Sequence, residues 1–366
     1  MVLKDSNIMI SRDQLIKSFI NKDSSILDAL KAINGSGTQL ALIIDENKVL
    51  KGVINDGDIR RSLLKGYKLS DSIKDIFNKN FHKITENQLG KEAKEKMFSI
   101  GLNAIPVINK EKQPIDILTY TNFSESKKLK NPLVIMAGGI GSRLLPYTKN
   151  CPKPMLPLNG NKPILLEIIE QAKLNGFESI YLSVNYLKEQ IMDYFKDGRE
   201  FGVNIEYLVE RKPLGTGGSL SLLPKNNQLP VLVINGDIIT KFNLKYLLDF
   251  HLSLNSNATM AVIEHETKLP FGVVKTNGTI LNSFEEKPVI SHLINAGLYV
   301  IDQDLINKLV NEDTQIDMPE LFWEAKHKNF NVNVCPIVEY WIDIGRPDAL
   351  KKAQHQGNID FTTNKN

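Results

Sequence analysis

The stretch LVIMAGGIGSRLLPYTKNCPKPMLPL (residues 133–158) decides the fold of the larger part of this sequence. It begins with an apolar run, LVIMA (133–137), that has the length and composition of a buried β-strand and leads into a glycine-rich loop. Further strand-like runs then alternate with helix-like stretches, and these runs cover 179–184, 204–209, 230–234 and 259–264. This alternation predicts βαβ units and a mostly parallel sheet. Ligands of such sheets lie beyond the carboxyl ends of the strands, so we expect the functional residues in the loops that follow them.

The loop after the first strand carries three glycines and a cation. Gly138, Gly139 and Gly141 precede Arg143 in a spacing that fits neither the P-loop nor the dinucleotide-binding fingerprint. Glycines allow backbone N–H groups to approach anionic oxygens, and a guanidinium suits phosphate. Lys153 follows between two prolines, whose fixed φ angles stiffen the backbone that carries it. A glycine loop alone is as often a mere tight turn, but this combination predicts a phosphate site.

The string MAGGIGSRLLPYTKNCPKPMLPL (136–158) resembles the signature of the sugar-nucleotide pyrophosphorylases, which transfer a nucleotidyl group from a nucleoside triphosphate to a sugar 1-phosphate. The resemblance covers about residues 131–350 and implies an α/β fold with a Rossmann-like, mostly parallel sheet of the glycosyltransferase-A-like type. It implies that Arg143, Lys153 and Asp237 are catalytic. It also implies a nucleotide-binding set that consists of Ala137, Gly138, Gly139, Gly141, Arg143, Glu210, Gly215 and Thr216.

Two later features fit the same resemblance. ERKPLGTGG (210–218) resembles the family loop near the nucleobase, and its glycine run is expected to open a helix whose unpaired N–H groups suit polar ligand atoms. Asp237 follows the strand-like run PVLVI, where a carboxylate is well placed to hold Mg²⁺, a cation that favours oxygen ligands. Asp343, within YWIDIG (340–345), resembles the second metal carboxylate of the family. The resemblance therefore implies Mg²⁺ as the cofactor.

Three segments resemble the sugar pocket of the family. In FEEKP (284–288), Lys287 would bind the phosphate of the acceptor and Glu286 the sugar hydroxyls. FGVV (271–274) and NAGLY (295–299) resemble the flanking segments. The resemblance implies sugar-phosphate binding by Gly272, Glu286, Lys287 and Asn295. A Glu-Glu-Lys sequence is otherwise an ordinary exposed turn, so these roles depend on the resemblance.

Residues 1–123 contain an internal repeat in which a similar order of helix, strand, turn, strand and helix recurs 64 residues further along. The repeat resembles a tandem pair of cystathionine-β-synthase (CBS) motifs, an α+β module that often binds adenine nucleotides, and GVINDGDIRR (52–61) is its best segment. The resemblance implies ligand positions at Asn55, Asp58, Thr119 and Asn122. Asn55 and Asn122 depart from the family's Ser/Thr and Asp, so a dimerisation platform is an equal alternative.

Length and composition fit two or three globular domains: 366 residues, 42% hydrophobic and 24% charged, with a formal net charge of +3. We expect a CBS pair over 1–127 (halves 1–66 and 67–127), a nucleotidyltransferase domain over 131–355 and a tail over 356–366. The charge does not indicate nucleic acid as a partner, and no apolar run reaches the ~18 residues of a membrane helix. Two cysteines and no apolar leader favour a cytoplasmic protein.

The prediction is an enzyme that converts GTP and glucosamine 1-phosphate into a nucleotide sugar and pyrophosphate. A CBS pair ahead of such a domain resembles the guanylyltransferases of legionaminic acid synthesis. Mannose- or heptose-1-phosphate guanylyltransferase, and glucose-1-phosphate thymidylyl- or uridylyltransferase, are alternatives of the same class. A non-catalytic nucleotide sensor is the alternative of another class. CBS pairs commonly dimerise, so we expect a homo-oligomer.

Overall fold

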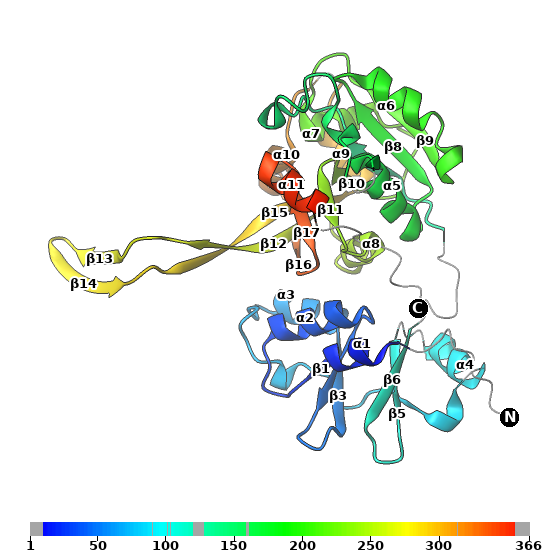
Figure 1. Ribbon diagram of the computed structural model, residues 1–366, viewed down its shortest axis with the longest axis vertical. Coiled ribbons are helices and arrows are strands. Elements are labelled where there is room, and N and C mark those ends of the chain that lie inside the picture. Colours follow the sequence, from blue (N-terminus) through cyan, green and yellow to red (C-terminus); the bar gives the residue numbers. More distant parts are fainter. Residues whose placement is uncertain are drawn as a thin grey trace. The chain divides into compact units, whose positions relative to one another are not determined.

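The computed structural model describes residues 10–119 and 128–355, apart from residues 90, 101, 103, 159, 160 and 313. The chain divides into two compact units, an N-terminal unit that ends before residue 128 and a C-terminal unit that begins there (Figure 1). Within the described residues, no helix is both long enough and apolar enough to cross a bilayer.

The N-terminal unit contains two small repeats. The first comprises α1 (Arg12–Lys17), β1 (Phe19–Ile20), α2 (Ile26–Ser36), β2 (Leu40–Ile44), β3 (Leu50–Asn55) and α3 (Asp56–Leu64). The second comprises η1 (Ile73–Asp75), β4 (Ile84–Thr85), η2 (Glu86–Gln88), α4 (Lys91–Ile100), β5 (Ala104–Ile108) and β6 (Pro114–Thr119). In each repeat the middle strand pairs in parallel with the short first strand and antiparallel with the third.

The two repeats have the same register. Leu40 pairs with Asn55 in the first sheet and Ala104 with Thr119 in the second, so both partners shift by 64 residues. Even the irregularity in the ladder recurs, at Ile43/Ile44 and again at Val107/Ile108. One apolar cluster contains side chains of both repeats, which therefore share a core: Leu15, Leu40, Leu42, Leu50, Val53, Ile108 and Ile117. The internal repeat expected from the sequence is present.

The C-terminal unit alternates strands and helices over most of its length. Its elements are β7 (Leu133–Met136), η4 (Ser142–Leu144), η5 (Lys153–Met155), α5 (Ile164–Leu174), β8 (Ser179–Val184), α6 (Lys188–Phe195), η7 (Arg199–Phe201), β9 (Asn204–Val209), α7 (Gly215–Gly218), η8 (Ser219–Leu222), β10 (Val231–Asn235), β11 (Ile238–Thr240), α8 (Leu244–Ser253), β12 (Ala258–Lys268), β13 (Val273–Asn277), β14 (Ile280–Glu285), β15 (Val289–Ile301), α9 (Gln303–Leu309), α10 (Met318–His327), β16 (Val332–Ile337), β17 (Trp341–Asp343) and α11 (Pro347–His355).

A seven-stranded sheet in the order β16-β12-β15-β10-β7-β8-β9 forms the centre of this unit. Only β15 runs antiparallel to its neighbours, and the other adjacent pairs are parallel. The strands β7 and β10 are almost wholly apolar because helices cover the sheet on both faces. Side chains of β7, β10, β15, α9 and α10 pack into one core around Tyr299. The mostly parallel α/β fold expected from the sequence is confirmed.

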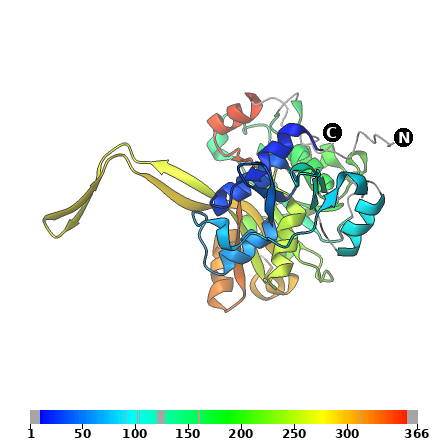
Figure 2. The ribbon, with the colours of Figure 1, turned by 90° about the horizontal axis from the view of Figure 1, so that it is seen from below.

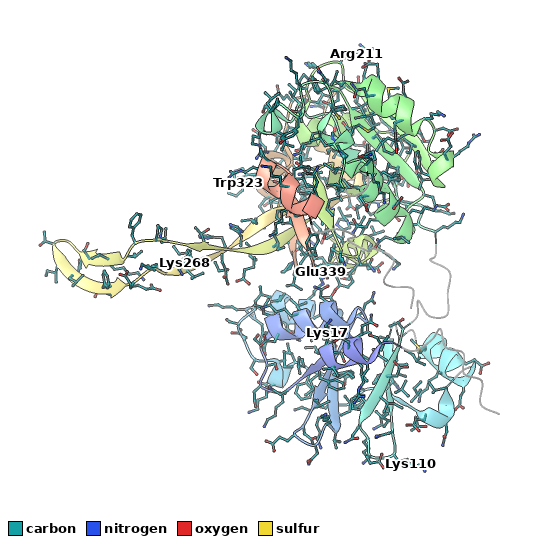
Figure 3. The ribbon with its side chains drawn as sticks, viewed as in Figure 1. Lys17, Lys110, Arg211, Lys268, Trp323 and Glu339 are labelled. Atoms are coloured by element: carbon teal, nitrogen blue, oxygen red, sulfur yellow. The ribbon has the colours of Figure 1, made fainter. Side chains whose placement is uncertain are left out.

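One feature departs from a compact α/β unit. The strands β12 and β15 pair from Ala258↔Ile301 to Lys268↔Val289 and leave the sheet as a long hairpin, which β13 and β14 complete. Figures 1 and 2 show this hairpin projecting away from the rest of the C-terminal unit in both views. We call residues 264–293 the arm. Side chains line it on both faces and face solvent, including Lys268, which Figure 3 labels.

Candidate active site

A cavity of about 420 Å³ lies at the carboxyl ends of β7, β8 and β10. This is the edge of the sheet at which the sequence predicts the functional residues. Its lining residues are Met136, Gly138, Gly139, Gly141, Ser142, Arg143, Lys153, Pro154, Ser183, Glu210, Pro213, Gly215, Thr216, Asn235, Gly236, Asp237, Asp317 and Gly345. The structure thus brings together most of the predicted nucleotide-binding residues. Ala137 is 1% exposed and donates its N–H to the carbonyl of Ser183 instead of lining the cavity.

A buried carboxylate, that of Glu210, packs against the glycine loop at Gly138. Glu210 accepts hydrogen bonds from Ser183 Oγ at 2.7 Å and from the N–H of Leu214 at 2.9 Å. A Cβ atom on Gly138 would lie 2.9 Å from Glu210 Oε1 and 3.2 Å from the backbone nitrogen of Asn185. Glycine is therefore needed at position 138 for close approach of the loop to β8 and β9. Glu210 supports the loop, and both of its carboxylate oxygens are already bonded within the protein.

Lys153 is largely withdrawn from solvent although it carries a charge. Its residue is 9% exposed, and it opens η5 directly after Pro152. Its Nζ forms an ion pair with Asp237 Oδ2. Buried charges require such a partner, and the pair fixes the ammonium group at the cavity wall. Arg143, in η4, is exposed on the same cavity and supplies a second cation.

Strand pairing brings the two predicted metal carboxylates together. The strand β11 pairs antiparallel with β17, so Ile238 lies opposite Asp343, and the N–H of Ile344 donates to the carbonyl of Asp237 at 2.9 Å. Burial and the negative charge of Asp237 raise the pKa of Asp343, while Lys153 and Arg143 oppose this rise. Asp343 Oδ1 is buried without a hydrogen-bond partner among the described residues.

These carboxylates fit a divalent cation with oxygen ligands. The unpartnered oxygen of Asp343 and the adjacent carboxylate of Asp237 are the donors that Mg²⁺ prefers. No group of three or more His, Cys, Asp or Glu side chains in the described residues could hold a metal ion by itself. A cation here would therefore need further oxygens from phosphates and water.

The start of α7 differs from the expectation. The N–H groups of Gly217 and Gly218 donate to the carbonyl of Ile316 at 2.9 and 3.0 Å, and the N–H of Thr216 donates to Asp317 Oδ1 at 2.9 Å. The prediction that these groups are unpaired is wrong, because the segment before α10 already accepts their hydrogen bonds. The hydroxyl of Thr216 is also engaged, since it accepts from the N–H of Met318 at 2.9 Å. Gly215 and Thr216 still line the cavity.

None of the four predicted sugar-phosphate residues lines the cavity, and three of them lie on the arm. The side chains of Glu286 and Lys287 are 59% and 58% exposed, and their charged groups are 3.9 Å apart. A Cβ on Gly272 would lie 2.5 Å from the ring of Phe284, so this glycine admits an aromatic ring across the arm. Asn295, at the base of the arm, donates to the hydroxyl of Tyr299 at 2.7 Å.

The predicted ligand positions of the N-terminal unit are partly used for helix capping. Asn55 Oδ1 accepts from the N–H of Asp58 at 2.8 Å, and Asp58 Oδ2 accepts from the N–H of Asn55 at 3.1 Å. This reciprocal capping box begins α3, and Arg61 binds the other carboxylate oxygen of Asp58 at 2.6 Å. Thr119 ends β6, and Asn122 lies outside the described residues.

The sequence reasoning missed two groups at the cavity. Asp317 lines it and binds Thr216, although the two residues are 101 positions apart. Asn235 also lines it, and its Oδ1 is buried without a partner among the described residues. The motif Asn-Gly-Asp (235–237) signalled Asn235, but only its aspartate was assigned a role. Nothing in the sequence around Asp317 distinguishes it from an ordinary residue at the start of a helix.

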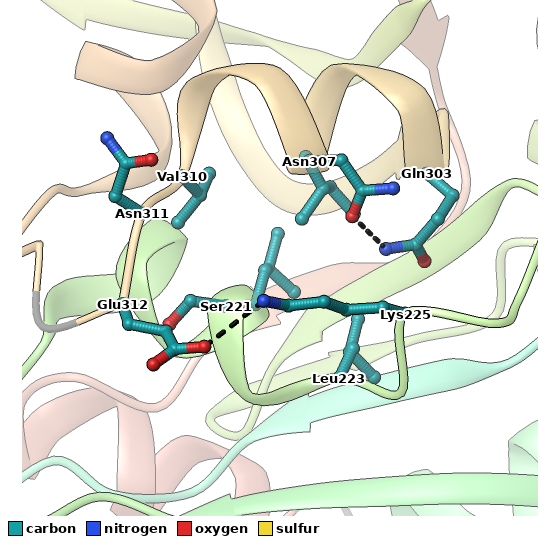
Figure 4. Close-up of a pocket in the computed structure, with 10 residues that line it drawn as sticks. Ser221, Leu223, Lys225, Gln303, Asn307, Val310, Asn311 and Glu312 are labelled. Atoms are coloured by element: carbon teal, nitrogen blue, oxygen red, sulfur yellow. Dashed lines mark hydrogen bonds and ion pairs between the residues drawn. The ribbon is translucent and has the colours of Figure 1, made fainter.

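A second cavity, of about 310 Å³, lies between η8 and α9 (Figure 4). Its polar side chains bind each other: Lys225 pairs with Glu312 at 3.1 Å, and Gln303 donates to Asn307 at 3.1 Å. These pairs occupy the groups that a polar ligand would need. The cavity at the glycine loop therefore remains the candidate active site.

Comparison with known protein families finds a match in each of the two units. Residues 133–358 match the nucleotidyl transferase family, and residues 8–65 match the CBS domain. The family match covers more than half of the chain, and the chain belongs to the nucleotidyl transferase family, with a CBS domain ahead of the transferase domain.

Curated relatives share part of their length with this chain. A mannose-1-phosphate guanyltransferase of Pichia angusta is 34% identical over 226 residues, which are 58% of this chain and 60% of the relative. The enzyme of that name from Saccharomyces cerevisiae is 34% identical over 227 residues, 58% of this chain and 61% of the relative. The chain thus spans about three fifths of the length of these relatives.

A solved structure shares the fold. A protein assigned as a glucose-1-phosphate thymidylyltransferase from Bacillus anthracis, in complex with sucrose, aligns with a TM-score of 0.50 at 21% identity. The alignment covers 62% of this chain and 94% of that one. At this level of identity, the likeness concerns the fold alone.

Proposed function

We propose that the C-terminal unit transfers a nucleotidyl group from a nucleoside triphosphate to a sugar 1-phosphate. A phosphate oxygen of the sugar 1-phosphate attacks the α-phosphorus, a new P–O bond forms, the bond to the β-phosphate breaks, and pyrophosphate leaves. No covalent enzyme intermediate is needed. The observation that carries this proposal is one cavity lined by a glycine loop, the cations Arg143 and Lys153, and the carboxylate Asp237. Asp343 lies beside this lining, because β17 pairs with β11 next to Asp237.

Catalysis by this site consists of positioning and charge stabilisation. The backbone of the glycine loop and the guanidinium of Arg143 would hold the triphosphate. Lys153 would offset negative charge that builds up on the α-phosphate and on the departing pyrophosphate. Its buried position supports this role, because a charge interaction is stronger where water is excluded.

Asp237 and Asp343 would hold Mg²⁺. The bound cation would neutralise charge on the phosphates, which is the usual contribution of Mg²⁺ to reactions of nucleoside triphosphates. Burial, and after it repulsion from Asp237, raises the pKa of Asp343, and a nearby cation would relieve this repulsion.

We further propose GTP as the donor and glucosamine 1-phosphate as the acceptor. The name of the curated relatives, mannose-1-phosphate guanyltransferase, supports GTP and makes mannose 1-phosphate the second candidate acceptor. The CBS domain ahead of the transferase domain supports glucosamine 1-phosphate, because this arrangement resembles the guanylyltransferases of legionaminic acid synthesis.

Pyrophosphate release would test the donor and the acceptor together. GTP, UTP, CTP, dTTP and ATP are each combined with glucosamine, N-acetylglucosamine, mannose, heptose and glucose 1-phosphates in the presence of Mg²⁺. We expect release from GTP with glucosamine 1-phosphate. Release from GTP with only mannose 1-phosphate would replace the acceptor and keep the reaction. If no pair reacts while GTP raises the melting temperature, the non-catalytic nucleotide sensor replaces the enzyme.

An adenine nucleotide at the CBS repeats is a separate proposal. It rests on the domain match at residues 8–65 and on the shared register of the two repeats. We expect AMP or ATP to raise the melting temperature of the full chain in the absence of GTP. Arg61→Ala removes the ion pair of Asp58 and keeps the capping box of α3, so loss of the shift in this variant would locate the ligand near α3.

A further inference from the structure

The arm lacks the support that an isolated hairpin requires. Most of its side chains between residues 264 and 293 are exposed, and among the described residues of the C-terminal unit no third strand or helix covers its two strands. Two-stranded hairpins are at best marginally stable in water unless another surface packs on them. A surface that packs on the arm would therefore stabilise it.

The side chains of the arm indicate an apolar partner surface. Eight large apolar residues of this segment are more than a third exposed: Phe271, Val274, Ile280, Leu281, Phe284, Val289, Ile290 and Leu293. Single exposed apolar side chains are common on protein surfaces, but a concentration of them in one segment marks a site of interaction. A stable interface between proteins buries about 800 Å² on each partner, and an arm that packs on the body of a partner would supply part of that area.

The base of the arm lies next to the candidate active site. Ile234 at the end of β10 pairs with Leu298 of β15, and a Cβ on Gly297 would lie 2.8 Å from the amide of Asn235. The arm therefore leaves the sheet at the edge that carries the cavity. The extended chain from Asn295 back to Lys287 spans roughly 25 Å, so it carries Lys287 well away from this edge. The pairing has a register shift between Met260 and Val262 but none from Val262↔Asn295 to Lys268↔Val289, and this regular part opposes a bend that would return the tip to its own cavity.

We propose that the arm of one copy packs on a second copy of this chain and delivers Lys287 and Glu286 to the sugar-phosphate end of the second copy's cavity. This inference rests on the proposed function. The cavity of one copy contains the glycine loop, Lys153 and Asp237 but no residue of the arm. A second copy is the occupant that completes the site and covers the apolar arm at once. A two-fold axis makes the exchange reciprocal, so each dimer contains two complete sites.

The test is complementation between two defective variants. Asp237→Asn disables the cavity but leaves the arm intact, whereas Lys287→Ala disables the arm but leaves the cavity intact. The two are co-expressed with different affinity tags, and heterodimers are isolated by tandem purification. Pyrophosphate release is measured at a low concentration of sugar phosphate, where each homodimer is nearly inactive. The control pair combines the wild type with Lys275→Ala, which changes another exposed lysine of the arm.

Arm exchange predicts that heterodimers regain about half of the wild-type rate, because one of their two sites combines an intact cavity with an intact arm. Heterodimers that remain as inactive as the parent homodimers would overturn the exchange. Full activity of Lys287→Ala, or a monomeric wild type, would overturn it too. A wild type that is inactive with every substrate pair would instead contradict the proposed function.

Oligomeric state gives a readout that does not depend on activity. The variant Phe271→Ser/Ile280→Ser/Phe284→Ser removes apolar area from the arm, and we expect light scattering to show a shift from dimer to monomer. The control variant Leu174→Ser/Leu252→Ser alters exposed apolar side chains of α5 and α8 and should stay dimeric. An arm variant that remains as dimeric as the control would overturn the proposal.

Discussion

The cavity and the arm hold the two halves of the predicted site, and they differ in how much protein surrounds them. At the cavity, Lys153 is 9% exposed and forms an ion pair with Asp237, and the buried Glu210 packs against Gly138 of the glycine loop. On the arm, Lys287 is 58% exposed and Phe271 is 75% exposed. The comparison teaches that the groups proposed to bind the phosphates are fixed by contacts within one chain, while the groups proposed to bind the acceptor are exposed on the arm and lack such contacts.

The largest expected effect is at the cavity, with Asp237→Asn. Loss of this carboxylate removes a ligand of the proposed Mg²⁺ and several kcal/mol of charge stabilisation, so kcat should fall on the order of 1000-fold. Pyrophosphate release measures the change, and circular dichroism should show an unchanged fold. Asp249→Asn, in an exposed ion pair of α8, is the matched control and should keep full activity. Retained turnover of Asp237→Asn in Mg²⁺ would remove this residue from the mechanism.

The next effect is on the arm, with Lys287→Ala. A charge-assisted contact to the acceptor phosphate would be lost, so the KM for the sugar 1-phosphate should rise on the order of 10- to 100-fold while the KM for the nucleotide stays unchanged. Steady-state kinetics with each substrate varied in turn separates the two constants. Lys275→Ala should alter neither constant. A change confined to the nucleotide would contradict the division between cavity and arm.

Two adjacent glycines of the loop offer a comparison within the cavity. Gly138→Ala places a methyl group against Glu210 and the backbone of Asn185, so we expect a destabilisation of about 1–3 kcal/mol and a lower melting temperature. Gly139→Ala meets no atom within 4 Å and should leave the melting temperature nearly unchanged. Equal melting temperatures of the two variants would show that the loop does not rest on Glu210.

The smallest expected effect concerns Asp116, a buried carboxylate of the N-terminal unit. Asp237 forms an ion pair with Lys153, whereas Asp116 accepts hydrogen bonds from backbone N–H groups. Asp116, in β6, is 1% exposed; its Oδ1 accepts from the N–H groups of Ile10 and Ile117, and its Oδ2 has no partner among the described residues. Burial raises its pKa, so the folded state binds a proton more tightly than the unfolded state. Asp116→Asn should therefore stabilise the protein at pH 7, by about 1 kcal/mol.

The pH dependence of this gain distinguishes its cause. The protonated Asp116 carboxyl favours the folded state, because its pKa is higher there than in the unfolded chain, where it is 3.8. This contribution to stability is complete at a pH below 3.8 and is lost as the pH rises through the pKa of the folded state. The advantage of Asp116→Asn should therefore shrink as the pH is lowered from 7 towards 4, which melting curves of both proteins would measure. A constant difference across this range would mean that burial of charge is not its source.

Local sequence determined much of this protein. The runs at 179–184 and 204–209 became β8 and β9 with those bounds, because strand formation follows from local composition and periodicity. The sequence also predicted the 64-residue repeat and the carboxylate after β10, because each depends on residues that are close in the chain. The glycine loop and the proline-flanked lysine were likewise readable as a phosphate site, and the structure places both on one cavity.

Tertiary structure decided what depends on residues far apart in the chain. The glycine run at α7 suggested free N–H groups, yet Ile316 and Asp317, about a hundred positions away, accept their hydrogen bonds. Segments 271–274 and 284–288 suggested a sugar pocket, yet pairing of β12 with β15 carries them onto the arm. A motif records which groups a site needs, whereas the long-range pairing of strands determines where those groups lie in the folded chain.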